Sequence, residues 1–253
     1  SITTFVSSSP APLTKLDPIQ YPNAKCLDGT NAGYYYSESI VVEDKLKWVI
    51  YLNGGGECDQ KESCESQLTS ALGSSNYFEN ESDMSSWYLA SDYCPYNPGR
   101  CTWNHVMDPY CTQDLHSGQV IEPTEDQWGL YFSGHHVFTS ILDELDQKEN
   151  SLLDATDIIL SGTSAGGIGV WMNVDYLADR YPNATVTAAT VAGFYFYATY
   201  YNGTNHTDAG GMADFRETAW PETYKLYNAY VDQDCKAANI DNPSICMISN
   251  QSY

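Results

Sequence analysis

Apolar residues along the chain recur in short runs separated by helical patterns. Three runs, Lys47–Leu52, Thr156–Leu160 and Val186–Val191, are rich in β-branched residues with few polar interruptions, as expected of strands covered on both faces. Apolar residues at helical spacing predict one helix over about 134–149 and another over about 165–180. Strands that alternate with helices predict an α/β fold, a mostly parallel sheet with helices on both faces.

Weaker signals fill the remaining chain. A first strand is expected at Gly33–Tyr36, and a short strand at His105–Met107. The polar stretch 59–103 predicts a helix near 62–72 followed by a long decorated loop. Because 253 residues suit one large domain, we expect an extended Ser/Pro/Thr-rich segment over 1–24 and a single domain over 25–253.

Charge and hydropathy narrow the class of protein. Asp and Glu number 33 against 11 Lys and Arg, a net charge of -22, so the surface repels nucleic acid and anionic membranes. The chain contains no run of eighteen apolar residues, so the sequence predicts no membrane span. The chain begins at Ser1 without an apolar leader, which is typical of a mature secreted form.

Cysteines and glycosylation sequons predict an extracellular protein. Eight cysteines allow 105 connectivities, and the economical pairing joins those close in sequence. That pairing is Cys58–Cys64, Cys94–Cys101, Cys235–Cys246 and, by remainder, Cys26–Cys111. Five Asn-x-Ser/Thr sequons begin at Asn80, Asn183, Asn202, Asn205 and Asn250. The cysteine and histidine spacings fit no zinc site, and no cofactor is expected.

The candidate chemistry centres on Gly162-Thr-Ser164-Ala-Gly166. An apolar strand precedes this Gly-x-Ser-x-Gly and a helix follows, which is the context of a nucleophile elbow in an α/β-hydrolase. Ser164 is then the nucleophile, and the N–H of Ala165 is one donor to the oxyanion. Gly54-Gly55-Gly56 follows an earlier strand and, paired with the elbow, predicts the other donors; taken alone it would also fit a tight turn beside Cys58.

Four segments resemble the pectin acetylesterase/Notum family, in the family's order. They are Cys26-Leu-Asp-Gly-Thr-Asn-Ala-Gly-Tyr-Tyr, Trp48-Val-Ile-Tyr-Leu-Asn-Gly-Gly-Gly-Glu-Cys58, Asp108-Pro-Tyr-Cys-Thr-Gln-Asp114 and Gly162-Thr-Ser-Ala-Gly-Gly167. The resemblance implies a serine carboxylic-ester hydrolase with Ser164 as nucleophile and an oxyanion hole of Gly55, Gly56 and Ala165. Gly56 stands where Notum-like members carry an aromatic residue, which favours a short acyl ester over a lipid.

The partners of Ser164 are harder to place. This fold orders its triad Ser, then Asp or Glu, then His, and only His206 follows Ser164. It lies between two sequons and is expected to be a solvated loop residue. The resemblance implies that the acid and the histidine follow the region of Cys246, so we expect them beyond Tyr253, on a further segment or a C-terminal chain of the same precursor.

Two functions remain open from the sequence. One is a secreted serine esterase that removes short acyl groups, such as acetyl, from a glycan or glycoconjugate of little charge. The other is a non-catalytic extracellular glycoprotein that keeps the fold for binding or assembly, which the 21 tyrosines favour because their rings are suited to binding contacts.

Overall fold

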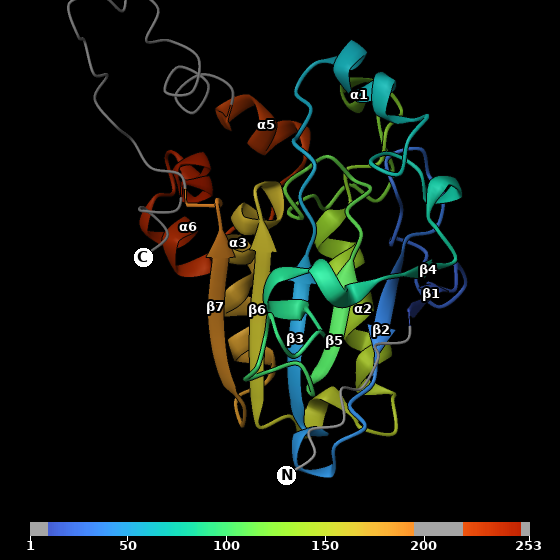
Figure 1. Cartoon of the computed structure of the whole chain (residues 1–253). Coiled ribbons are helices and arrows are strands. Elements are labelled where there is room, and N and C mark those ends of the chain that lie inside the picture. The colour runs from blue at the N-terminus through green and yellow to red at the C-terminus, as the bar shows by residue number, and fades with distance from the viewer. Residues whose placement is uncertain (1–9, 195–219, 249–253) are drawn as a thin grey trace, which may run out of the picture.

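A seven-stranded mixed sheet forms the centre of the molecule (Figure 1). The computed structural model describes residues 10–194 and 220–248. The strand order is β4-β1-β2-β5-β3-β6-β7. The strands are β1 (Ala11–Lys15), β2 (Gly33–Ser37), β3 (Lys47–Leu52), β4 (Glu81–Ser82), β5 (Asn104–Asp108), β6 (Asp157–Thr163) and β7 (Thr185–Val191).

The sheet is parallel on one side and antiparallel on the other. β5, β3, β6 and β7 are parallel neighbours, whereas β4, β1, β2 and β5 pair antiparallel. The register places Leu52 opposite both Asp108 and Gly162, and Thr163 opposite Val191. Four strands therefore end at one edge of the sheet, where α/β proteins form their sites.

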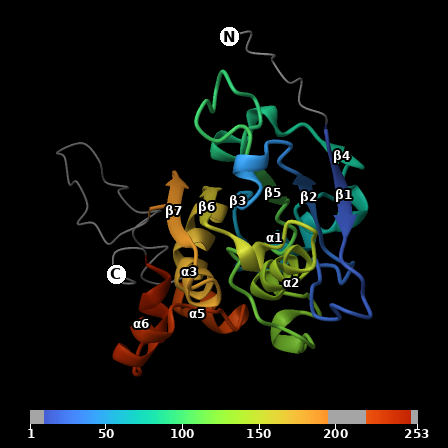
Figure 2. The ribbon, with the colours of Figure 1, turned by 90° about the horizontal axis from the view of Figure 1, so that it is seen from below.

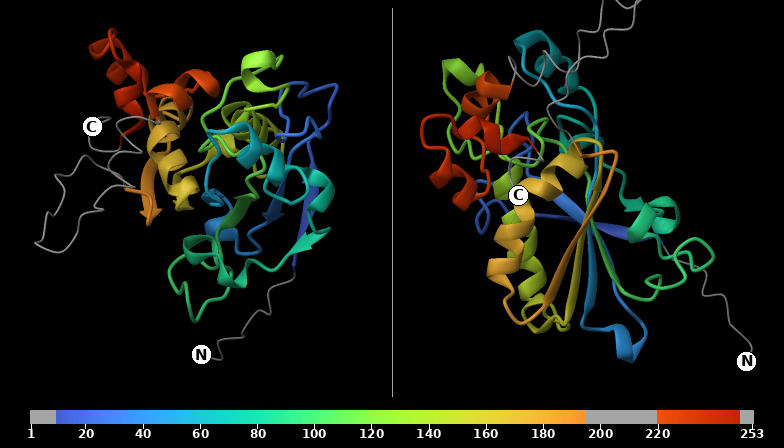
Figure 3. Two further views of the ribbon diagram at one scale, coloured as in Figure 1. Left: turned by 90° about the horizontal axis from the view of Figure 1, so that it is seen from above. Right: turned by 90° about the vertical axis from the view of Figure 1, so that its left-hand side faces the viewer.

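Two long helices cover one face of the sheet, as Figures 2 and 3 show. They are α2 (Gly134–Asp146) and α3 (Ala165–Arg180), which close the larger core over β3 and β6. The other α-helices are α1 (Lys61–Gln67), α5 (Trp220–Leu226) and α6 (Gln233–Ala238). No helix among the described residues has both the length and the apolar character to cross a bilayer.

The opposite face is covered by short 3-10 helices within the described residues (Figure 3, right). η3 (Met84–Ser86) and η4 (Tyr88–Ala90) bury Met84 and Ala90 against Tyr51 and its neighbours. This layer takes the place of the α-helices expected on that face, because residues 84–103 carry no helical run of apolar positions. The other 3-10 helices are η1 (Val42–Asp44), η2 (Ser75–Tyr77), η5 (Glu125–Gln127), η6 (Leu152–Asp154) and η8 (Pro243–Met247).

The expected elements are present with small shifts. The helix predicted over 165–180 has those bounds, whereas α1 ends at Gln67 rather than 72. β1 lies in the segment expected to be extended, and it joins the same sheet by pairing with β2. The buried side chains of β3 explain its polar-free run, since β5 and β6 flank it and both faces are covered.

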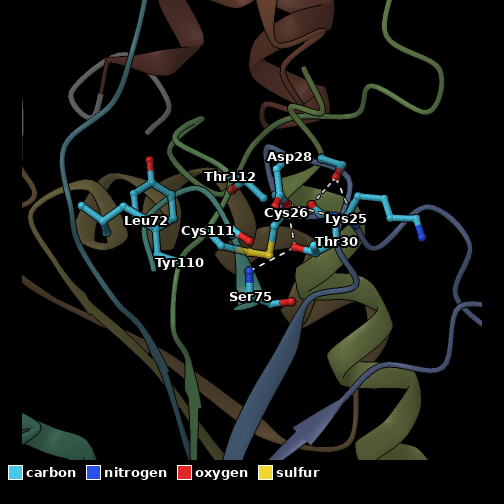
Figure 4. Close-up of a disulfide and its surroundings, with 12 residues drawn as sticks. Lys25, Cys26, Asp28, Thr30, Leu72, Ser75, Tyr110, Cys111 and Thr112 are labelled. Carbon is cyan, nitrogen blue, oxygen red and sulfur yellow. Dashed lines mark hydrogen bonds between the residues drawn. A yellow bond between two sulfur atoms is a disulfide. The ribbon is translucent and has the colours of Figure 1, made fainter. Parts of the chain in front are cut away.

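All four disulfides have the economical pairing, and no described cysteine is free. Cys26–Cys111 spans 85 residues and ties the chain after β1 to the residues that follow β5 (Figure 4). Beside it, the N–H of Leu27 donates to the carbonyl of Cys111 at 2.8 Å. Of the sequon asparagines, Asn80 and Asn183 are exposed; Asn202, Asn205 and Asn250 lie outside the described residues.

Candidate active site

Ser164 occupies a strained turn between β6 and α3. Its φ of 56° and ψ of -120° are sparsely populated for a residue with a side chain, and such strain is concentrated at functional sites. A Cβ on Gly162 would clash with the carbonyl of Gly166, and one on Gly166 with the carbonyl of Leu52. Glycine at both positions therefore lets the chain turn sharply enough to hold the hydroxyl above the sheet.

The Gly-rich loop passes directly over this turn. A Cβ on Gly54 would lie 3.1 Å from Cβ of Ser164 and would clash with the carbonyl of Thr163. Gly56 has a φ of 79°, and a Cβ there would meet nothing within 4 Å, so the mouth of the site is open at this residue. Ala165 begins α3, and its N–H has no acceptor within the helix.

The segment 108–116 holds the carbonyl groups of this loop from behind. The carbonyl of Asn53 accepts from Nε2 of His116 at 2.9 Å, and that of Gly55 from Nε2 of Gln113 at 3.2 Å. The carbonyl of Gly56 accepts from the hydroxyl of Tyr110 at 2.8 Å. These contacts fix three peptide units of the loop. They were not predicted, although the motif at 108–114 was among those that carry the family resemblance.

The hydrogen bonds to the loop carbonyls also fix the direction in which the N–H groups of the Gly-rich loop point. In a trans peptide the C=O and the following N–H point in opposite directions, and the described residues contain no cis peptide. Since the carbonyl of Gly55 points to Gln113, the N–H of Gly56 points away from the segment 108–116. The N–H of Gly54 is already taken by Oδ1 of its neighbour Asn53 at 3.0 Å. Of these two N–H groups, that of Gly56 rather than that of Gly54 is therefore free to donate to an oxyanion.

A buried ion pair anchors the segment. Nδ1 of His116 lies 3.2 Å from Oδ2 of Asp108, and both side chains are buried. Burial lowers the pKa of His116, but the charge and hydrogen bond of Asp108 outweigh it, so the pKa is raised above its usual value. Both ring nitrogens face acceptors, the carboxylate and the carbonyl of Asn53. Donation to both acceptors at once requires the protonated imidazole, which the raised pKa favours.

The backbone of this segment is strained throughout. Tyr110, Gln113, Leu115 and His116 all have φ between 55° and 60°. Each left-handed residue with a side chain costs about 1 kcal/mol or more. The surrounding contacts offset this cost: the ring of Tyr110 stacks on His116 at 4.5 Å, and Asp114 accepts from the N–H of Gly134 at 2.7 Å. So many strained residues behind one loop indicate that its position matters for function.

Two further histidines, His105 and His135, are engaged elsewhere. Nε2 of His105 lies 2.8 Å from the carbonyl of Arg100, and Nδ1 of His135 lies 2.7 Å from Oδ1 of Asn173. Burial lowers the pKa of each of these two rings to about 4. His136 precedes Ser164 as well, and His206 lies outside the described residues. Within 10–194 and 220–248, no group of three or more acidic, cysteine or histidine side chains could hold a metal ion.

Glu57, the residue after the Gly-rich loop, carries a carboxyl in an apolar setting. Its Oε2 is enclosed and has no hydrogen-bond partner among the described residues. Burial raises the pKa of Glu57 to about 7, and the nearby indole of Trp220 offsets part of that rise. The folded protein therefore holds this proton more tightly than the unfolded chain does.

Stability should fall as Glu57 ionises. With its pKa raised from 4.5 to about 7 on folding, the stabilisation is complete below pH 4.5 and is lost by about pH 7. We expect Glu57→Gln to raise the free energy of unfolding at pH 8 by up to about 3 kcal/mol over the wild type, with little difference at pH 4.5. Urea unfolding at both pH values measures this. Glu62→Gln, at an exposed site on α1, is the control, and an equal response of both variants would contradict the assignment.

The parallel strands, the strained serine after β6 and the glycine loop after β3 together define an α/β-hydrolase of the serine type. A model of the pectinacetylesterase family matches residues 6–253. The chain belongs to this family, whose members are carboxylic-ester hydrolases.

Its relatives are of two kinds. It is 31% identical to pectin acetylesterase 5 of Arabidopsis thaliana over 246 residues, which cover 96% of this chain and 55% of the relative. It is 36% identical to the palmitoleoyl-protein carboxylesterase NOTUM of Schmidtea mediterranea over 160 residues, 62% of this chain and 29% of the relative. The solved Wnt deacylase Notum from Drosophila superposes with a TM-score of 0.79 at 25% identity, covering 96% of this chain and 67% of that one. The chain spans about half the length of the plant pectin acetylesterases it matches.

Proposed function

We propose that this protein is a secreted serine carboxylesterase that removes short acyl groups, such as acetyl, from a glycan or glycoconjugate of little charge. The observation that carries the proposal is Ser164, held at φ 56° and ψ -120° beneath a glycine loop whose carbonyls are fixed from behind. A binding protein does not need this arrangement. An esterase needs it, because its serine hydroxyl must attack the ester and the oxyanion that forms must be stabilised.

In the proposed mechanism, Ser164 Oγ attacks the ester carbonyl while a base accepts its proton. The carbonyl oxygen becomes an oxyanion, which the N–H groups of Ala165, Gly55 and Gly56 receive. The alcohol leaves with a proton returned by the base, and water then releases the acyl group from Ser164 by the same route. His116 acts at a distance, as a positioning residue for the loop.

The base and its orienting acid are proposed to lie outside the described residues, on a segment beyond Tyr253. Two facts support this: His116, His105 and His135 are each bound elsewhere, and the plant relatives are about twice as long as this chain. Intact mass after deglycosylation, compared with the 28.1 kDa of residues 1–253, would identify such a segment.

Secretion and the size of the acyl group have separate support. Four disulfides and the exposed sequon residues Asn80 and Asn183 suit an oxidising, glycosylating compartment. At Gly56 no described atom lies within 4 Å of the position that a side chain would occupy, so this position offers no described wall to a long acyl chain. The net charge of -22 disfavours a polyanionic glycan.

An active-serine phosphonate tests the function directly. We expect the intact protein to be labelled at Ser164 and to hydrolyse p-nitrophenyl acetate with a kcat/KM at least about tenfold above that for p-nitrophenyl palmitate. Boiled protein is the control for non-specific labelling. If a preparation of confirmed full length shows neither labelling nor turnover, the esterase proposal is wrong and the non-catalytic binding function is favoured.

A further inference from the structure

A groove beside the nucleophile turn lies on the face of the sheet opposite α2 and α3. It encloses about 520 Å³ between the 3-10 layer and the end of β7. Its lining residues are Ser85, Ser86, Tyr88, Leu89, Ser91, Tyr96, Asn97 and Val191. None of these described residues is charged, and six of the eight carry a hydroxyl or an amide.

We propose that this tyrosine groove binds a neutral stretch of glycan next to the acyl group that Ser164 removes. The inference rests on the proposed esterase function and adds a subsite and a substrate class to it. It is carried by three features of the groove: its exposed rings, its rigid frame and its connection to Ser164.

Both tyrosine rings leave most of their surface in solvent, although each also contacts a neighbouring ring. Tyr96 is 77% exposed and Tyr88 is 55% exposed, unusual for large side chains at the rim of a cavity. Tyr88 also has a left-handed φ of 50°, so this ring is held in its position by a strained backbone. A flat apolar ring with a polar tip, beside serine hydroxyls, complements a sugar ring, which has apolar C–H faces and a hydroxylated rim.

The frame around the rings is fixed before any ligand binds. Asn97 is buried, and its Nδ2 donates to the carbonyls of Leu89 at 2.9 Å and Ser91 at 2.8 Å. The hydroxyl of Ser91 donates to the carbonyl of Ser85 at 2.6 Å. The Cys94–Cys101 disulfide closes the loop that carries Tyr96. A platform ordered in this way loses little entropy when it binds.

Two contacts connect the groove to the nucleophile. The carbonyl of Val191, at the groove wall, accepts from the N–H of Ser164 at 3.0 Å. On the other wall Tyr88 stacks on Tyr51, whose hydroxyl is hydrogen-bonded to that of Thr163. A chain lying in the groove would therefore present its substituents close to Ser164.

A neutral glycan fits better than the other occupants of such a groove. A long acyl chain needs enclosure, whereas these rings stand in solvent. A polyanion such as polygalacturonate would meet a lining whose described residues include no cation to receive it, on a protein of net charge -22.

Binding should be measured with the full protein carrying Ser164→Ala, so that turnover cannot consume the ligand. The probes are hexasaccharides of glucose, xylose and mannose, with hexagalacturonate as the charged comparison, by titration calorimetry. We expect at least one neutral hexasaccharide to bind, and Tyr88→Ala and Tyr96→Ala each to weaken it about five- to tenfold. Tyr77→Ala, an equally exposed tyrosine outside the groove at 51%, should leave binding unchanged.

The outcomes separate this inference from the esterase proposal. If no neutral hexasaccharide binds, if hexagalacturonate binds as tightly, or if Tyr77→Ala weakens binding as much, the groove is not a neutral glycan subsite. Hydrolysis of p-nitrophenyl acetate by the wild type would stand in each of those cases. Melting temperatures of the tyrosine variants, expected to match that of Tyr77→Ala, exclude misfolding as the cause of a loss.

Discussion

Ser164→Ala should reduce turnover of p-nitrophenyl acetate at least about a thousandfold and leave the protein folded. In the proposed mechanism the hydroxyl oxygen bonds to the acyl carbon, so no neighbouring group can replace it, and only stabilisation of the oxyanion would remain. The variant should also lose all labelling by the active-serine phosphonate. Steady-state kinetics and labelling on one preparation, with the melting temperature recorded, measure the effect.

Ser161→Ala is the matched control. Ser161 lies on β6, three residues before Ser164, with a fully buried hydroxyl that has no hydrogen-bond partner among the described residues. Removing an unpaired buried hydroxyl costs little and can stabilise. Activity should be unchanged. Equal losses in the two variants would mean that damage to β6, rather than loss of a nucleophile, explains the result.

Tyr110→Phe should lower kcat by about 10- to 100-fold with a smaller change in KM. Its hydroxyl donates to the carbonyl of Gly56 at 2.8 Å and accepts from the N–H of Leu115 at 3.0 Å. Without it the loop can drift, and a small displacement of an oxyanion donor is costly in the transition state. The phenyl ring would keep the stack on His116, so the change is confined to the two hydrogen bonds.

Tyr227→Phe distinguishes positioning from stability. The hydroxyl of Tyr227 is also buried and donates to the carbonyl of Cys58 at 2.7 Å, beyond the glycines. Each variant loses buried hydrogen bonding worth about 1–3 kcal/mol of unfolding free energy. Only Tyr110→Phe should change kcat. A similar fall of kcat in both would show that Tyr110 acts through general stability.

The sequence predicts the elements that are determined by residues close to one another in the chain. β3 and β6 are recognised by uninterrupted apolar runs, α3 by its periodicity, and the turn at Ser164 by two glycines that only a tight turn requires. The disulfide pairing follows from proximity along the chain. Each of these signals lies within about twenty residues, where propensity and chain geometry dominate.

What the sequence could not predict depends on contacts between distant segments. The left-handed conformations from Tyr110 to His116 have no glycine to signal them, and they persist because a buried ion pair and the disulfide at Cys111 hold them. The layer around η3 and η4 has no periodicity, since its order comes from Asn97 and from packing on Tyr51. Local pattern carries no information on either.

The strand order has a consequence for biosynthesis. β1, β2, β5 and β3 are contiguous in the sheet and are complete by residue 108, and β6 and then β7 add to the free edge of β3 in the order of translation. Three of the four disulfides also lie within the first 111 residues. A chain emerging amino-terminus first can thus form the disulfides on either side of the glycine loop before β6 and the turn at Ser164 leave the ribosome. Ser164 and Ala165 are therefore translated after the glycine loop against which their turn packs.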